Sequence, residues 1–231
     1  MKRHIPNIFT CLNIICGFVG ITQAFSTTEN GLLVACYLVG VAAIFDFIDG
    51  MSARLLGAYS DLGKQLDSLA DMISFGLLPG IIMYKLLLTT APPGSMLPYA
   101  ATVIPLFSAL RLAKFNLDDD QDGSFIGLPT PAHAVFIASL PLAGYQHIEF
   151  NLLVNPEALA LLSGITSLLL VSRIPMFSLK MKSAGWSENR NQYLSIIAAL
   201  IIISVFHFIG FTIVIILYIL TSLFKSIIKT S

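Results

Sequence analysis

The chain has 231 residues, of which 56% are hydrophobic and only 11% are charged, and its mean hydropathy is +0.83. These values lie far from those of soluble domains and indicate an integral membrane protein. The formal net charge is zero, so the composition gives no support for a nucleic-acid partner held by bulk positive charge.

Eight apolar runs, separated by polar or Pro- and Gly-containing stretches, follow one another along the chain. Because one membrane-spanning helix takes about 20 residues, eight helices with short loops use up the chain. We therefore predict an all-α, polytopic membrane helix bundle that forms a single domain over residues 1–231. The predicted helices cover residues 8–25, 32–56, 64–88, 97–113, 132–145, 158–171, 193–206 and 208–224.

The positions of Lys and Arg predict the orientation of the bundle, since cytoplasmic loops carry an excess of positive charge. With the N-terminus inside, 12 of the 13 basic residues lie on or near the cytoplasmic side, and only Lys85 lies toward the other face. An even number of spans then places both termini on the cytoplasmic side. Trp186 and the tyrosines are interpreted as residues of the interfacial belts.

The stretch "DFIDGMSARLLGAYSDLGKQLDSLAD", residues 46–71, places four aspartates near the cytoplasmic ends of the second and third predicted helices. The first two are three residues apart and the last two are four apart, so each pair lies on one face of its helix. The four are Asp46, Asp49, Asp67 and Asp71.

An unpaired charge at the centre of a membrane helix costs about 2.5 to 3.5 kcal/mol, and somewhat less near the interface. A cation must therefore offset the charge of the four carboxylates. Oxygen ligands without accompanying His or Cys suit a hard ion such as Mg²⁺ or Mn²⁺, and four carboxylates could hold two such ions.

Small residues beside the acids indicate that something approaches the helix backbone there. Gly50, Ala53, Gly57 and Gly63 lower the helix surfaces, and Arg54 offers a fork of donors suited to phosphate. Together with the acids, these residues predict a diphosphate site. Taken singly, an acid pair could also serve as a proton relay, and small residues also allow helices to pack.

The start of the first predicted helix lies at the same membrane depth as the acids. Asn7 and Thr10 are therefore expected to contact a ligand bound at the acids. The alternative for Asn7 is a helix cap, because Asn is a preferred capping residue.

The spacing Asp-x2-Asp-Gly-x2-Ala-Arg-x8-Gly-x3-Asp-x3-Asp over residues 46–71 resembles, at all eight fixed positions, the signature of the CDP-alcohol phosphatidyltransferase family. The resemblance implies transfer of a phosphatidyl or similar group from a CDP-linked donor to an alcohol, with release of CMP, inside a bundle with six core helices. It implies that the first three aspartates, with Asp71 assisting, hold two divalent ions on the diphosphate, and that Asp71 is the general base. It also implies a homodimer. The residues expected to contact the CDP-linked lipid are Asn7, Thr10, Asp49, Gly50, Ala53, Arg54 and Gly63.

Three further stretches resemble the branch of this family that uses L-serine: "PNIFTCLN" at residues 6–13, "SALRLAKFN" at 108–116 and "GLPTPA" at 127–132. The likeness implies CDP-diacylglycerol as donor and L-serine as acceptor, among the lipids of a bacterial or archaeal cell membrane. The family core is expected over residues 6–190, with two additional helices over 191–226.

Two cations and one amide of the fourth predicted helix are candidates for binding the acceptor. Arg111 and Lys114 could hold the serine carboxylate, and Asn116 could bond to the serine ammonium or hydroxyl group. Both cations could instead be interface anchors that obey the positive-inside rule.

Several alternatives stay open on the sequence alone. Within the family, the acceptor could be glycerol 3-phosphate, inositol phosphate or choline. A small cation or proton transporter is the rival from another class, but it predicts acids spread through the bilayer depth, whereas these cluster at one face. No nucleophilic Cys or Ser motif is evident, which favours direct attack over a covalent intermediate. Acyl-chain preference and the choice between Mg²⁺ and Mn²⁺ are not encoded in any motif of the chain.

Overall fold

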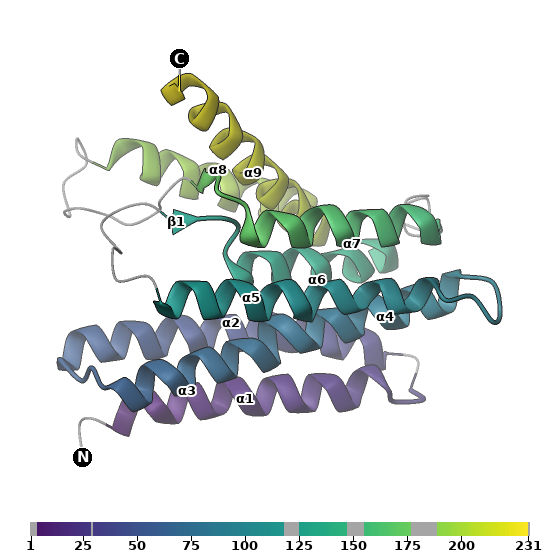
Figure 1. The fold of residues 1–231 in the computed structure, drawn as a ribbon, viewed down its shortest axis with the longest axis horizontal. Coiled ribbons are helices and arrows are strands. Elements are labelled where there is room, and N and C mark those ends of the chain that lie inside the picture. Colours follow the sequence, from purple (N-terminus) through teal and green to yellow (C-terminus); the bar gives the residue numbers. More distant parts are fainter. Residues whose placement is uncertain (1–3, 29, 118–124, 147–154, 177–188, 231) are drawn as a thin grey trace.

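The structure is a computed structural model that describes residues 4–28, 30–117, 125–146, 155–176 and 189–230 (Figure 1). Most of these residues are helical, which confirms the predicted all-α bundle. The helices are α1 Ile5–Ala24, α2 Gly31–Leu56, α3 Asp61–Asp71, α4 Leu78–Thr90, α5 Val103–Leu117, α6 Thr130–Gln146, α7 Pro156–Val171, α8 Arg190–Phe206 and α9 Phe208–Thr230. The predicted position of Trp186 falls outside the described residues.

Some of these helices join end to end into longer rods. A π-helical segment, Met72–Leu77, links α3 to α4, so that Asp61–Thr90 is one rod of 30 residues. A 3-10 helix, Leu97–Thr102, leads directly into α5. The described residues thus form eight rods at the eight predicted places. Five of them are long and apolar enough to cross a membrane, which confirms a multi-pass protein; the full number of eight spans stays a prediction.

The turn between α2 and α3 is short because both of its ends are built into the sequence. Gly57 ends α2 in the left-handed conformation at φ 59°, where a side chain would be strained. Ser60 begins α3, and its Oγ accepts a hydrogen bond from the Gly63 N–H at 3.0 Å. The end of α2 and the start of α3 therefore lie together at one end of the bundle, the left end in Figure 1.

The rod Asp61–Thr90 lies at the centre of the bundle. Half of its apolar window is buried, against 22–33% in the other four long spans. Phe75, Leu78 and Ile82 are completely buried along it. A Cβ atom on Gly20 of α1 would lie 2.6 Å from Leu78 Cδ2, so α1 packs directly on this rod only because Gly20 has no side chain. This contact fixes α1, and with it Thr10, relative to the acids of α3.

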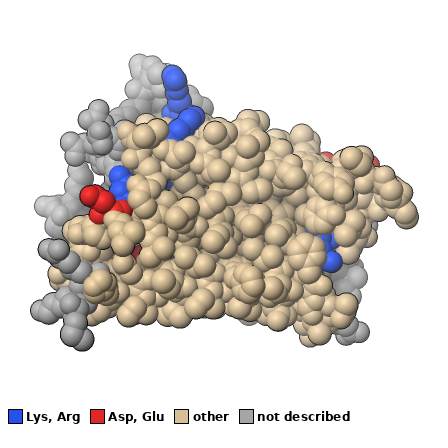
Figure 2. Space-filling model, turned by 60° about the horizontal axis from the view of Figure 1, so that its bottom comes forward, with Lys and Arg blue, Asp and Glu red and all other residues tan. Residues whose placement is uncertain are grey.

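The surface between the two ends of the molecule is apolar. Figure 2 shows charged residues near the ends of the visible face and an uncharged belt between them. Large apolar side chains are also exposed: Phe18, Phe47 and Leu161 are 64–65% exposed. In water such exposure would be costly, whereas in a bilayer these side chains contact lipid.

A short antiparallel pair of strands, which the sequence analysis did not predict, lies beside the helices. It pairs β1, Phe125–Ile126, with β2, Pro175–Met176. Directly after β1, the Gly127 N–H donates to Ile174 O at 2.9 Å, and Gly127 takes φ 77°. A Cβ there would lie 2.5 Å from Leu170 O, so only glycine fits. The stretch "GLPTPA" is thereby held against the end of α7, at the start of α6.

Candidate active site at the α2–α3 turn

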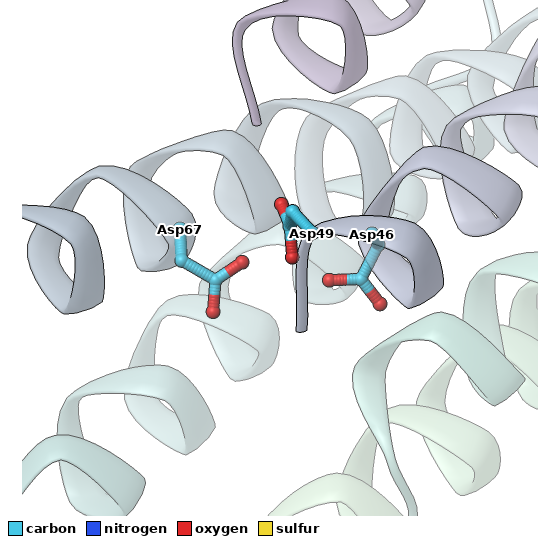
Figure 3. A group of neighbouring side chains, drawn as sticks. All are labelled: Asp46, Asp49 and Asp67. Atoms are coloured by element: carbon cyan, nitrogen blue, oxygen red, sulfur yellow. The ribbon is translucent and has the colours of Figure 1, made fainter. Parts of the chain in front are cut away.

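Three of the four predicted aspartates converge in the structure. One carboxylate oxygen from each of Asp46, Asp49 and Asp67 lies within 4.8 Å of the other two. Figure 3 shows the three carboxylates gathered across the gap between the helices, with Asp46 and Asp49 coming from α2 and Asp67 from α3. Asp49 is only 6% exposed. The two acid pairs therefore face one another, as the spacing predicted.

Thr10 ties α1 to this cluster. Its hydroxyl donates to Asp49 Oδ2 at 2.9 Å and lies 3.2 Å from Pro6 O, its own carbonyl one turn back. The side chain is 3% exposed. The structure thus brings Thr10 to the acids, where it orients one carboxylate; contact with a nucleotide stays a prediction.

Asp71 lies next to the cluster and faces two kinds of neighbour. Its carboxylate interacts electrostatically with the like charges of Asp46 and Asp67 and with the opposite charge of the Arg111 guanidinium. One oxygen of Asp71, Oδ1, is buried without a hydrogen-bond partner, and so is Oδ1 of Asp67. A buried acceptor left without a partner is costly, so both oxygens are available to a ligand.

The donor set fits a divalent cation. Two carboxylates at this separation repel by about 3 to 4 kcal/mol at the effective dielectric of a protein site. All candidate ligands in the cluster are carboxylate oxygens, and Asp67 and Asp71 each offer an unpartnered one. Hard ions such as Mg²⁺ and Mn²⁺ prefer ligands of this kind, and binding one would remove the repulsion. The residues present are therefore suited to the predicted metal.

The small residues and Arg54 lie around the same turn. Gly50 leaves open space: a Cβ there would have only Arg54 Nη2 within 4 Å, at 3.8 Å. Arg54 is exposed and uses its Nε to donate to Gly50 O at 2.9 Å. A Cβ on Gly63 would lie 3.4 Å from Asn7 Oδ1, which places the start of α1 against the start of α3. Ala53 lies half-buried on α2 beside Arg54.

The three predicted acceptor residues differ in what surrounds them. Arg111 is 8% exposed, donates from Nη1 to Thr130 Oγ1 at 2.6 Å, and faces Asp71. Lys114 is exposed. Asn116 pairs with Ser68 of α3: its Nδ2 donates to Ser68 Oγ at 2.9 Å, and that hydroxyl lies 3.2 Å from its Oδ1. The structure thus brings Arg111 to the acids, while Asn116 links α5 to α3.

Three residues at or beside the site were not singled out by the sequence analysis. Thr130 lies within the quoted stretch "GLPTPA", so that motif carried a signal for it. Ser68 follows Asp67 directly and holds Asn116. Tyr218 of α9 interacts electrostatically with Arg111 and packs against the buried side chains of Leu128, Leu170 and Met176. Its place in an interfacial belt stays a prediction, and no local pattern marks it as different from the other tyrosines.

Comparison with known proteins gives a consistent family assignment. A family model described as CDP-alcohol phosphatidyltransferase matches residues 3–169. Two curated relatives are named CDP-diacylglycerol--serine O-phosphatidyltransferase. The protein of Mycobacterium leprae is 37% identical over 179 residues, covering 74% of this chain and 57% of the relative, and that of Bacillus subtilis is 34% identical over 172 residues, covering 74% and 89%. An archaetidylserine synthase of Methanothermobacter thermautotrophicus is 34% identical over 143 residues, covering 61% and 59%.

The fraction of each relative's own length that the match covers differs between the relatives. The match spans little more than half of the Mycobacterium leprae and Methanothermobacter proteins, but most of the Bacillus subtilis protein. The matched part of this chain contains α1 to α7 and all four aspartates, whereas α8 and α9 follow the end of the family match.

Proposed function

Since this chain belongs to the CDP-alcohol phosphatidyltransferase family, we propose that it transfers the phosphatidyl group of CDP-diacylglycerol to the hydroxyl of L-serine. The products are phosphatidylserine and CMP. The observation that carries the proposal is the convergence of Asp46, Asp49 and Asp67 at a turn where a buried arginine also faces Asp71. The names of the relatives support serine as the acceptor.

We propose that two divalent cations, Mg²⁺ or Mn²⁺, are held by the three aspartates of the cluster together with Asp71. The cluster residues are partly buried and all-oxygen, and two of the four aspartates keep an unpartnered oxygen. When bound, such ions neutralise the charge of the diphosphate and of the leaving CMP.

The CDP-linked end of the lipid would lie over the end of α2 and the start of α3. The open surface at Gly50 lets a phosphate approach the backbone, and the exposed Arg54 can pair with it. Asn7 and Gly63 lie side by side at the edge of the same surface. Thr10 would act indirectly, because its hydroxyl orients the Asp49 carboxylate. The half-buried Ala53 has a small side chain, which leaves room for the ligand on this surface.

Asp71 is the proposed general base. The serine hydroxyl oxygen forms a bond to the lipid-side phosphorus, the bond from that phosphorus to the CMP oxygen breaks, and the hydroxyl proton passes to the Asp71 carboxylate. The unpartnered Oδ1 of Asp71 supports this role, because it is free to accept the proton. The proximity of Arg111 to Asp71 would bring an acceptor bound through its carboxylate within reach of the base.

Support for the three acceptor residues is unequal. Arg111 is buried beside the acids, so its charge is little screened and its guanidinium suits a carboxylate. Lys114 is exposed, which also suits an interface anchor. Asn116 is already paired with Ser68, so contact with serine would require it to give up that bond.

We propose that this end of the bundle and both termini face the cytoplasm. Arg54, Lys64, Arg111 and Lys114 lie at the site end, whereas Lys85 lies near the far end of its rod, over the Phe25 ring. Lys2, Arg3, Lys180 and Lys182, which also entered the prediction, lie outside the described residues. A single domain whose core ends near residue 190, followed by two added helices, and a homodimer are part of the same proposal.

The test is CMP release by the purified protein in detergent or vesicles containing CDP-diacylglycerol. We expect release that depends on L-serine and on Mg²⁺ or Mn²⁺. Parallel reactions with glycerol 3-phosphate, inositol phosphate and choline identify a sister transferase if one of these supports faster release. Cation or proton flux across the vesicles without any acceptor-dependent CMP release would contradict a transferase altogether.

A further inference from the structure

Helix α9 follows the family match, which ends at residue 169, and yet it reaches the candidate active site. It is pinned to α6 by a hydrogen bond between the hydroxyls of Thr212 and Ser139, 2.7 Å apart and both buried. Further along, Ser222 is completely buried and Ile215 is 8% exposed. One face of α9 is therefore fixed against the rest of the bundle.

Tyr218 lies on that fixed face. At about 100° per residue, Thr212, Ile215 and Ser222 fall within one side of the helix, and Tyr218 falls on the same side. Its ring packs against a small buried cluster formed by Leu128, Leu170 and Met176. Since Leu128 precedes Thr130 by two residues, Tyr218 contacts the segment that holds Arg111.

The Arg111 guanidinium keeps at least one buried donor without a partner. Nη1 donates to Thr130 Oγ1 at 2.6 Å, while Nε is buried without a hydrogen-bond partner. The charge interacts electrostatically with both the Asp71 carboxylate and the Tyr218 phenol. A buried N–H without a partner is costly, so an anionic group beside Arg111 would be stabilised.

We propose that Tyr218 is a specificity-determining residue of the acceptor site, whose phenol O–H donates a hydrogen bond to the same acceptor carboxylate that Arg111 binds. The inference rests on the proposed function. A carboxylate held by one guanidinium needs further donors for its remaining lone pairs, and a phenol supplies one without adding charge. A single arginine already facing Asp71, together with a neutral phenol, suits an acceptor with one negative charge better than a phosphate dianion.

The rival explanation is that Tyr218 only fills space against Leu128 and Leu170. Replacing Tyr218 with Phe separates the two, because the ring and its packing remain and only the hydroxyl is lost. Tyr145→Phe is the matched control: Tyr145 is 69% exposed at the end of α6 far from Thr130.

The experiment measures steady-state CMP release by the full chain, varying L-serine and CDP-diacylglycerol in turn. For Tyr218→Phe we expect the KM for L-serine to rise about tenfold, as for loss of one hydrogen bond to a charged group, with the KM for CDP-diacylglycerol unchanged. Tyr145→Phe should match the unmodified protein.

Three outcomes would overturn the proposal. An unchanged KM for L-serine in Tyr218→Phe means that the hydroxyl makes no contact with the acceptor. Equal rises in both KM values in Tyr218→Phe mean that the hydroxyl supports the structure of the site and does not bind the acceptor. Failure of the unmodified protein to use L-serine at all would contradict the proposed function itself, and is seen before any variant is made.

Discussion

The acid half and the acceptor half of the candidate active site are assembled in different ways. The acid half is local, because its four aspartates fall within residues 46–71 on two helices joined by a short turn. The acceptor half brings together Arg111 from α5, Thr130 from α6 and Tyr218 from α9. A local site depends on helix geometry and one turn, whereas a site built from three distant helices depends on how the whole bundle packs.

The largest expected effect is loss of the acid half. Asp67→Asn keeps the shape of the side chain but removes a charged oxygen ligand, so turnover should fall at least about a hundredfold, or about 2.7 kcal/mol of barrier. Excess EDTA should have the same effect on the unmodified protein. The measurement is CMP release at saturating substrates.

The control for this variant is Asp61→Asn, which changes an exposed aspartate in the first turn of the same helix. It should retain normal turnover. Retention of more than about a tenth of the activity by Asp67→Asn, less than 1.4 kcal/mol of barrier, would argue against a ligand role for this carboxylate.

Asp71 lies where the two halves meet, so its replacement tells which half it serves. If it is mainly the base, Asp71→Asn should lower kcat by about 10² to 10⁴ while metal-dependent binding of CDP stays intact. The measurements are CDP titrations with and without Mg²⁺ and single-turnover CMP release. Loss of CDP affinity to the extent seen in Asp67→Asn would make Asp71 chiefly a metal ligand, and normal binding with normal turnover would exclude both roles.

A pair of arginine variants tests whether the two halves act separately. Arg111→Ala should raise the KM for L-serine about 10- to 100-fold, since it removes a charge-assisted hydrogen bond, and leave the KM for CDP-diacylglycerol nearly unchanged. Arg54→Ala should show the opposite bias. Equal losses for both substrates in both variants would mean that the two arginines support the fold.

The smallest expected effect concerns the link from α1 to the acid half. Thr10→Val removes the hydroxyl that donates to Asp49 Oδ2 and keeps the branched shape. The Mg²⁺ concentration for half-maximal activity should rise about tenfold, as for loss of a residue that orients a metal ligand. Thr22→Val is the control, because Thr22 bonds only to its own helix at Val19 O. Equal metal requirements in the two variants would leave Thr10 with a packing role.

The difference between a local site and one built from distant helices explains which features could be predicted from the sequence. The eight apolar runs predicted the eight rods, because the length and hydrophobicity of a membrane helix are properties of a local stretch of sequence. The spacing of the aspartates predicted that each pair shares one face of its helix, since helical periodicity is also a local property. Thr130 and Tyr218 could not be assigned to the site in this way. Their roles arise from contacts between helices that no spacing encodes, and Tyr218 resembles the other tyrosines in its apolar surroundings. The strand pair that fixes Gly127 was missed because two-residue strands leave no periodicity.

The π-helical segment Met72–Leu77 sets the rotational phase between the two parts of the central rod. A π-turn takes an extra residue, so the acids of α3 point toward α2 while Leu78, four residues beyond Ser74, fits the gap that Gly20 leaves in α1. If the same six residues were wound as a regular α-helix, the extra residue would turn α3 by about 100° relative to α4. The carboxylates would then leave their cluster although every one of them was still present. The π-helical winding of these six residues is therefore as much a requirement of the site as the identity of its acids.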